Sequence, residues 1–276
     1  MNLNIYHDIK KSIQPFDTGA LLRLGNNYDG GYVLSQKLLS HSKSLFSLGS
    51  NNEWSFELDF VKKASNYVLI IDDNYSQTIL IKTLIYRVLS IFNFRQFRFK
   101  ISEVMSLFSI CFGYITLKIK SKNKVRYLNH SVGTNNKAHS ISFGQLWNLF
   151  FSNKADMNVL VKMDIEGSEY ACIEDILKVH DQLSGIIIEF HDILEKPDRF
   201  FQILKEIQSV FTIEHVHYNN YSKLEYGLAD VIEITFINND LCNEKMIKLN
   251  REYPLLGLDY PNNLEKEDFK VDLNSN

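Results

Sequence analysis

The chain has 276 residues, of which 45% are hydrophobic and 23% are charged, and its formal net charge is -3 at pH 7. This composition excludes a disordered chain and a collagen-like repeat, and the small net charge excludes a protein that binds polyanions through its bulk charge. Three widely spaced cysteines argue against a disulfide framework or a zinc knuckle, and the first residues contain no apolar signal core. We therefore expect a cytoplasmic protein.

Strand and helix patterns alternate along the chain. Residues 1–40 are predicted to form a lead-in with the turn-rich segment RLGNNYDGGYVL, and residues 264–276 a polar tail. Between them, strands are predicted at 44–49, 67–72, 125–129, 158–164, 185–192 and 230–238, and helices at 51–64, 142–151, 168–178 and 199–208. This alternation predicts one α/β domain over 41–263, with a mostly parallel central sheet and helices on both of its faces.

Residues 77–126 interrupt the alternation. They contain an apolar helix candidate at 79–94 and a charge-free run at 104–117, which is shorter than the roughly 20 residues of a transmembrane helix. Their basic residues face a single acid, Glu103: Lys82, Arg87, Arg95, Arg98, Lys100, Lys118, Lys120, Lys122, Lys124 and Arg126. Two interpretations stay open, a helical insertion with a solvated basic face and a docking surface for a phosphorylated substrate or an anionic membrane.

Several predicted strands end in a polar residue or a glycine: Gly49, Asp72, Asp164 and Glu189. Because ligands of such sheets bind at the carboxyl ends of the strands, these residues indicate a site. Asp72 follows the Gly49 turn at about the 20-residue spacing at which a dinucleotide fold places its ribose-binding acid. The turn lacks the G-x-G-x-x-G that a pyrophosphate needs, so it favours the adenosine of S-adenosylmethionine over NAD.

Three side chains are predicted to form one polar cluster at neighbouring strand ends. Asp164 lies in KMDIEGSEY, where Glu166 and Glu169 suit the start of the next helix. Glu189 and His191 are two residues apart and therefore point to the same side of an extended chain. Two carboxylates and an imidazole together can hold a proton or a divalent metal.

A second pair of histidines, His215 and His217, also has a spacing of two residues. This pattern fits either a polar substrate wall or an exposed edge strand, and we favour the edge strand.

The segment VKMDIEGSEYACIEDIL resembles the K-x-D-x-E-G-x-E signature of the FkbM-type S-adenosylmethionine-dependent methyltransferases. Further segments resemble parts of that family: LFSLGSNNEWSFELDF, IIIEFHD, RLGNNYDGGYVL and LDYPNN. The resemblance spans residues 45–263 together with the DGGYV segment, whereas 77–126 is longer and more basic than the family's connection.

The resemblance implies a Rossmann-like class I methyltransferase fold with a helical basic insertion between the second and third strands. It also implies cofactor-binding roles that can be transferred residue by residue. Gly49, Ser50 and Asn51 would border the methionine part of the cofactor, and Asp164 would lie below the methyl donor. Asp72, or else Asp73, would bind the ribose hydroxyls. His130 and Ser131 would lie beside the adenine.

The activity that the resemblance implies is O-methylation of a sugar hydroxyl, on a nucleotide-activated sugar or a glycan precursor in surface polysaccharide biosynthesis. His191 would be the general base, or Mg²⁺ or Mn²⁺ would bind at Asp164, Glu189 and His191.

Two other functional classes fit the sequence less well. A nicotinamide-dependent sugar oxidoreductase is disfavoured by the missing G-x-G-x-x-G and the absence of a Tyr-x-x-x-Lys pair. A non-catalytic module that binds nucleic acid or membrane is disfavoured by the intact D-x-E-G-x-E and E-x-H patterns. We therefore expect a small-molecule sugar substrate, no nucleic-acid partner, and peripheral membrane contact at most, through 77–126.

Overall fold

The computed structural model describes residues 4–64, 67–73, 108, 111–122, 124–133, 140–152, 158–242 and 246–273. The apolar helix expected at 79–94 lies outside these residues, as does most of the 77–126 insertion. Residues 111–120 of the insertion are described and are helical.

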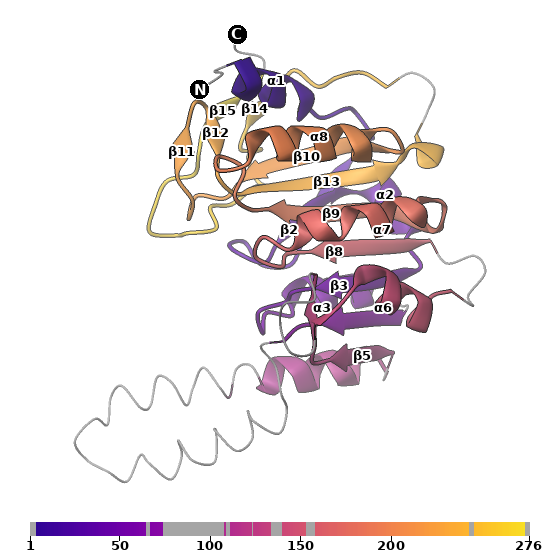
Figure 1. The fold of residues 1–276 in the computed structure, drawn as a ribbon. Helices are drawn as coiled ribbons and strands as arrows, with labels where there is room; N and C mark the ends of the chain where they lie inside the picture. Colours follow the sequence, from indigo (N-terminus) through magenta and orange to yellow (C-terminus); the bar gives the residue numbers. More distant parts are fainter. Residues whose placement is uncertain are drawn as a thin grey trace.

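The core of the molecule is a seven-stranded sheet with the order β10-β13-β9-β8-β3-β4-β5 (Figure 1). Its strands are β3 (Ser44–Leu48), β4 (Tyr67–Ile71), β5 (Val125–Leu128), β8 (Val159–Met163), β9 (Leu183–Phe190), β10 (Phe211–Tyr218) and β13 (Ile232–Asn238). The five strands from β9 to β5 are parallel, and β13 runs antiparallel to both of its neighbours. The predicted mostly parallel sheet is therefore confirmed.

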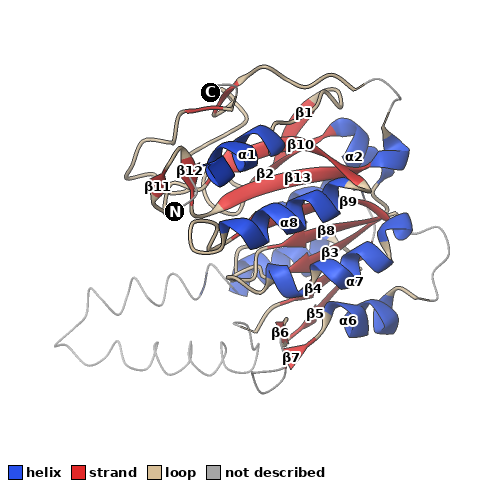
Figure 2. Cartoon of the chain, turned by 45° about the horizontal axis from the view of Figure 1, so that its top comes forward, coloured by secondary structure: helices blue, strands red, loops and turns tan. Residues whose placement is uncertain are grey.

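Helices cover both faces of this sheet, as predicted (Figure 2). One face packs against α1 (Asn4–Ser12), α6 (Phe143–Phe150), α7 (Ile173–Lys178) and α8 (Pro197–Gln208); the other packs against α2 (Gln36–His41), α3 (Ser55–Ala64) and residues 111–120. The alternation of strand side chains produces the two layers: Phe46 faces the first and Leu45 the second.

Two predicted helices differ in detail from those observed. The helix expected over 51–64 begins at Ser55, because Asn51 and Asn52 have positive φ angles of 44° and 62° and form a turn. The helix expected over 168–178 is divided into a 3₁₀ turn, Glu169–Ala171, and the short α7. By contrast, α6 starts as expected, because Ser142 and Gln145 form a capping box.

The N-terminal segment is part of the packed structure. The antiparallel hairpin of β1 (Leu21–Leu24) and β2 (Tyr32–Ser35) contains the DGGYV residues, and Thr235 on β13 donates a hydrogen bond to the carbonyl of Val33. Near the other end, β14 (Glu252–Tyr253) pairs with β15 (Val271–Asp272), and Leu273 is buried. Both segments lie against the edge of the sheet formed by β10 and β13.

The remaining elements are short. They are the strands β6 (Ser131–Val132), β7 (Ser140–Ile141), β11 (Leu224–Glu225) and β12 (Leu228–Ala229), and the 3₁₀ turns His180–Gln182 and Asn239–Leu241. Every helix within the described residues is too short or too polar to cross a membrane.

Candidate functional site

A cavity of about 880 Å³ opens at the carboxyl ends of the parallel strands. This is the position at which α/β sheets of this kind bind their ligands. Every residue that the sequence indicated for cofactor binding or catalysis lines it: Gly49, Ser50, Asn51, Asp72, Asp73, His130, Ser131, Asp164, Glu189 and His191. The topology thus brings into one cavity residues that are far apart in the sequence. Gly49 and His191, for example, are 142 positions apart.

The loop after β3 is shaped by Gly49 and Asp72. Gly49 has a φ of 72°, and a Cβ added there would collide with the carbonyl oxygen of Asp164. Asp72 Oδ2 accepts hydrogen bonds from the Ser50 amide (2.7 Å), the Ser50 hydroxyl (2.9 Å) and the Asn51 amide (2.7 Å). Asp72 therefore has a structural role in this loop, which the sequence pattern did not indicate. Asp73, the alternative ribose ligand, is exposed and also lines the cavity.

His130 follows β5 and contributes a buried polar atom to the cavity. Its Nδ1 has no hydrogen-bond partner among the described residues. Buried polar atoms are normally paired, so the unpaired Nδ1 marks His130, which the family resemblance places beside an adenine, as a candidate for ligand contact. Ser131 lies next to it in the same lining.

The other end of the cavity holds the predicted polar cluster. The Tyr32 hydroxyl lies 3.3 Å from Asp164 Oδ2 and 3.4 Å from Glu189 Oε2, so it bridges the two carboxylates. Asn219 Nδ2 donates to Glu189 Oε1 at 2.8 Å, and His191 Nε2 lies 3.8 Å from the same oxygen. The structure therefore places Asp164, Glu189 and His191 together, with Tyr32 between the carboxylates.

Glu169 fixes the orientation of His191. Its side chain is fully buried, and its Oε1 lies 2.9 Å from His191 Nδ1 while accepting from the amides of Ile165 (3.2 Å) and Gly167 (3.1 Å). His191 Nε2 is thereby left facing the cavity, 3.5 Å from Glu166 Oε2. Glu169 had been interpreted as an acid that suits a helix start, but it links the turn after β8 to the residue after β9.

The pKa values in the cluster are shifted by burial and by neighbouring charge. Burial alone would lower the pKa of His191, but the hydrogen bond to Glu169 and the nearby carboxylates outweigh it and raise the pKa to about 9. Burial raises the pKa of Asp164 to about 6, although Lys162 and His191 oppose the shift. Burial and the charge of Asp164 raise the pKa of Glu189 well above its ordinary range. At neutral pH, His191 is thus a proton donor beside carboxylates that are stronger bases than usual.

A buried lysine lies beneath the cluster. Lys162 on β8 donates from Nζ to the Gly49 carbonyl at 2.7 Å, and its ammonium lies 5.2 Å from the centre of the Tyr32 ring. It therefore ties the loop after β3 to the hairpin that carries Tyr32, and it supplies a positive charge where several carboxylates are buried.

A metal-ligating geometry exists, with one difference from the predicted set. Among the described residues, ligand atoms of Asp164, Glu166 and His191 all lie within 4.8 Å of one another. The sequence had indicated Glu189 in place of Glu166, but the Glu189 carboxylate is held by Asn219 and Tyr32. Glu166 reaches the group because it occupies a turn with a φ of 54°.

The His215 and His217 pair lies on the edge strand β10 but is not exposed, and neither residue lines the cavity. His215 pairs with Asp259, and His217 pairs with Glu233 (3.2 Å) and Asp268 (3.0 Å). The pairs with Asp259 and Asp268 hold the C-terminal segment against the sheet, and the pair with Glu233 joins β10 to β13. The predicted edge strand is confirmed, and its expected exposure is wrong because that segment covers it.

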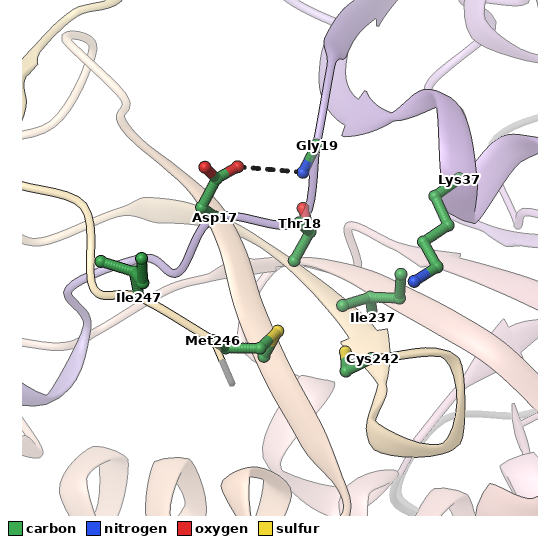
Figure 3. A pocket seen from close by; sticks show the side chains of 8 residues that line it. All are labelled: Asp17, Thr18, Gly19, Lys37, Ile237, Cys242, Met246 and Ile247. Atoms are coloured by element: carbon green, nitrogen blue, oxygen red, sulfur yellow. Dashed lines mark hydrogen bonds between the residues drawn. The ribbon is translucent and has the colours of Figure 1, made fainter. Parts of the chain in front are cut away.

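A second, smaller cavity of about 320 Å³ lies at the other end of the sheet, next to Ile237 (Figure 3). Ile237 pairs with Gly185 at the start of β9, far from the strand ends that carry the cluster. The charged residues that line this smaller cavity are Asp17 and Lys37. The Asp17 carboxylate accepts a hydrogen bond from the Gly19 amide. We assign the function to the larger cavity, where the titratable groups converge.

No family model and no curated protein matches the chain. Among solved structures, the chain is similar to the fibrillarin/Nop5p complex (12% identity, TM-score 0.38, covering 72% of this chain and 73% of that chain). It is also similar to a Methanococcus jannaschii fibrillarin pre-rRNA processing protein (9%, 0.37, 82% and 87%) and to precorrin-6y C5,15-methyltransferase from Geobacter metallireducens GS-15 (10%, 0.33, 72% and 84%). Similarities this low do not assign a function to this chain. A function must therefore be argued from its own side chains.

Proposed function

We propose that the protein is an S-adenosylmethionine-dependent O-methyltransferase that acts on a sugar hydroxyl. The observation that carries this proposal is the single cavity in which the Gly49–Asp72 loop and His130 face the cluster of Asp164, Glu189 and His191. A methyl donor held by the first group would present its methyl to an acceptor held by the second. Such alignment of two reactants is the main requirement of an in-line displacement.

The charge of the lining supports this cofactor. Among the described lining residues, the acidic side chains are Asp29, Glu53, Glu57, Asp72, Asp73, Asp164, Glu166, Glu189 and Asp230, and the only lysine is Lys162. S-adenosylmethionine carries a sulfonium and an ammonium, which suit an acidic cavity, whereas the pyrophosphate of NAD does not. The same reasoning favours a neutral or amino sugar of a glycan precursor at the acceptor end, and a nucleotide-activated sugar would have to keep its diphosphate outside.

Glu189 and His191 have different roles in activating the acceptor hydroxyl. When bound, S-adenosylmethionine supplies the methyl: the carbon–oxygen bond forms as the carbon–sulfur bond breaks, with its electron pair left on sulfur. Glu189 is the group that would accept the hydroxyl proton, because its carboxylate lines the cavity beside His191 Nε2, at 3.8 Å. His191, held at Nδ1 by Glu169, donates from Nε2 and stabilises the negative charge that develops on the oxygen.

A divalent cation at Asp164, Glu166 and His191 is an alternative to proton donation by His191, because the ion would occupy the same Nε2. Two carboxylates and one imidazole suit Mn²⁺ or Mg²⁺, and Glu169 would orient the imidazole from behind. When bound, such an ion lowers the pKa of a nearby hydroxyl. Calorimetry with Mn²⁺ tests it without any acceptor: one site in the wild type, weakened in Glu166→Gln, supports it, and no heat of binding contradicts it.

The decisive test of the proposed function is calorimetry of the full chain with S-adenosylmethionine and with NAD. We expect binding of S-adenosylmethionine alone. Binding of NAD alone would favour the oxidoreductase, and binding of neither would favour a non-catalytic module. A screen of sugars with S-adenosylmethionine, with and without divalent cation, would then identify the acceptor.

Asp72→Ala is expected to weaken S-adenosylmethionine binding by about 1.5–3 kcal/mol and also to lower the Tm. The first effect reflects a lost ribose contact or a displaced loop, and the second follows because three donors of Ser50 and Asn51 lose their acceptor. Asp73→Ala is the matched control, and as an exposed residue it should leave the Tm unchanged. Unchanged affinity in Asp72→Ala would leave Asp73 as the ribose ligand.

A further inference from the structure

The helix over residues 111–120 leaves a stripe of large apolar side chains uncovered. Phe112 is 72% exposed, Ile115 53% and Ile119 71%, and Phe108, one turn before Phe112, is 49% exposed. Spacings of three and four residues place Phe112, Ile115 and Ile119 on one face of the helix. Soluble proteins rarely expose contiguous apolar side chains of this size unless something binds there.

The opposite face of the same helix is anchored in the core. Tyr114 is 8% exposed and Leu117 is fully buried. The Tyr114 ring contacts the rings of Trp54 (5.9 Å between centroids) and Tyr127 (6.3 Å), and the Tyr127 hydroxyl donates to the carbonyl of Asp72 at 2.7 Å. The helix lies beside β5 at the edge of the sheet (Figure 1). Its orientation relative to the sheet is therefore fixed, and the stripe points away from the described residues that pack against Tyr114 and Leu117.

The charged residues on and directly after this helix are all basic. Residues 108, 111–122 and 124–128 contain no acid, and their charged members are Lys118, Lys120, Lys122, Lys124 and Arg126. Lys120 and Lys122 are exposed, whereas Lys118 Nζ donates to the Val125 carbonyl at 3.0 Å and is turned toward β5. Long lysine stems beside an apolar face let the charged ends reach lipid headgroups while the apolar side chains are buried.

We propose that this apolar–basic surface, formed by Phe112, Ile115 and Ile119 with Lys120 and Lys122, docks on the surface of an anionic lipid bilayer. The helix would lie in the plane of the interface, with its apolar stripe among the acyl chains and its lysines at the anionic headgroups. This attachment is independent of the proposed methyl transfer. It would hold the enzyme at a membrane through a rigid helix that is connected to the rim of the cavity by Tyr114, Tyr127 and Asp72.

Cosedimentation of the full chain with vesicles tests the proposal. The wild type is expected to sediment with phosphatidylcholine vesicles that contain phosphatidylglycerol, and far less with phosphatidylcholine alone. The double variant Phe112→Ser, Ile119→Ser should lower the partition coefficient by at least about tenfold, since two apolar side chains no longer enter the bilayer. Lys120→Gln with Lys122→Gln should also lower it about tenfold, and added salt should act in the same direction.

Leu149→Ser is the matched control, because Leu149 is 69% exposed but lies on α6. It should sediment like the wild type, and all variants should keep the wild-type Tm because the replaced side chains are exposed. The proposal is overturned if the wild type does not sediment with anionic vesicles, or if the double variant sediments equally well. It is also overturned if, without lipid, the wild type is a dimer and Phe112→Ser a monomer, since a second copy would then cover the stripe.

Discussion

Replacing His191 with alanine is expected to lower kcat for methyl transfer by about 10²–10⁴-fold. The imidazole is the group that Glu169 holds with Nε2 facing the cavity, between Glu166 and Glu189. Without it, neither a proton donor nor a metal ligand remains at the position where negative charge develops. The affinity for S-adenosylmethionine should be unchanged, because the cofactor loop after β3 does not depend on this side chain. Steady-state kinetics and calorimetry on the same preparation measure the two quantities.

His41→Ala is the control for this experiment, because His41 is exposed at the end of α2 and far from the cavity lining. It should keep the wild-type kcat. Glu169→Gln should give an intermediate loss, since a glutamine oxygen can still accept from the His191 ring but carries no charge. If His191→Ala kept the wild-type kcat, the assignment of the acceptor end of the cavity to catalysis would be wrong.

The sheet and the position of the site could be predicted from the sequence because both depend on local patterns. Apolar runs such as 44–49 and 158–164 are typical of buried parallel strands, and these two runs pair in parallel. The carboxyl ends of parallel strands lie at the same end of the sheet. The residues after those runs therefore had to converge. By contrast, the lead-in of residues 1–40 contains short elements whose identity depends on tertiary packing. The hairpin of β1 and β2 is stabilised by contacts with strands about 200 positions away, such as that of Thr235 with Val33.

The same distinction explains what the sequence did not indicate in the site. Tyr32 and Asn219 reach Glu189 from distant parts of the chain, and no pattern within either segment specifies that contact. Glu169 stands where an acid would suit a helix start, so its local signal was the same whether it faced solvent or His191. Only the DGGYV motif, which carries Tyr32, offered a signal, and its resemblance to a family segment did not specify a role.

The ion pairs of His217 are expected to make a large contribution to stability. The imidazole is buried between Glu233 and Asp268, which connects β10, β13 and the C-terminal segment. Removing one partner of a buried, hydrogen-bonded charge pair leaves the other charges uncompensated. His217→Asn should therefore lower the free energy of unfolding by about 3–5 kcal/mol near neutral pH, as measured by urea denaturation. His41→Ala, on an exposed ring, should change it little.

The pH dependence of that difference separates an ion pair from simple packing. Burial alone would lower the pKa of His217, but Glu233 and Asp268 outweigh it and raise the pKa to about 10, above its ordinary value of 6.5. A group whose pKa is higher in the folded state stabilises the fold fully below the unfolded value, and the contribution is lost as the pH rises through the folded value. The wild type should thus lose stability relative to His217→Asn between about pH 6.5 and 10. His191, whose pKa is also raised, titrates in both proteins and cancels in the comparison. A difference that stays constant over this range would mean that His217 acts by filling space and not by its charge.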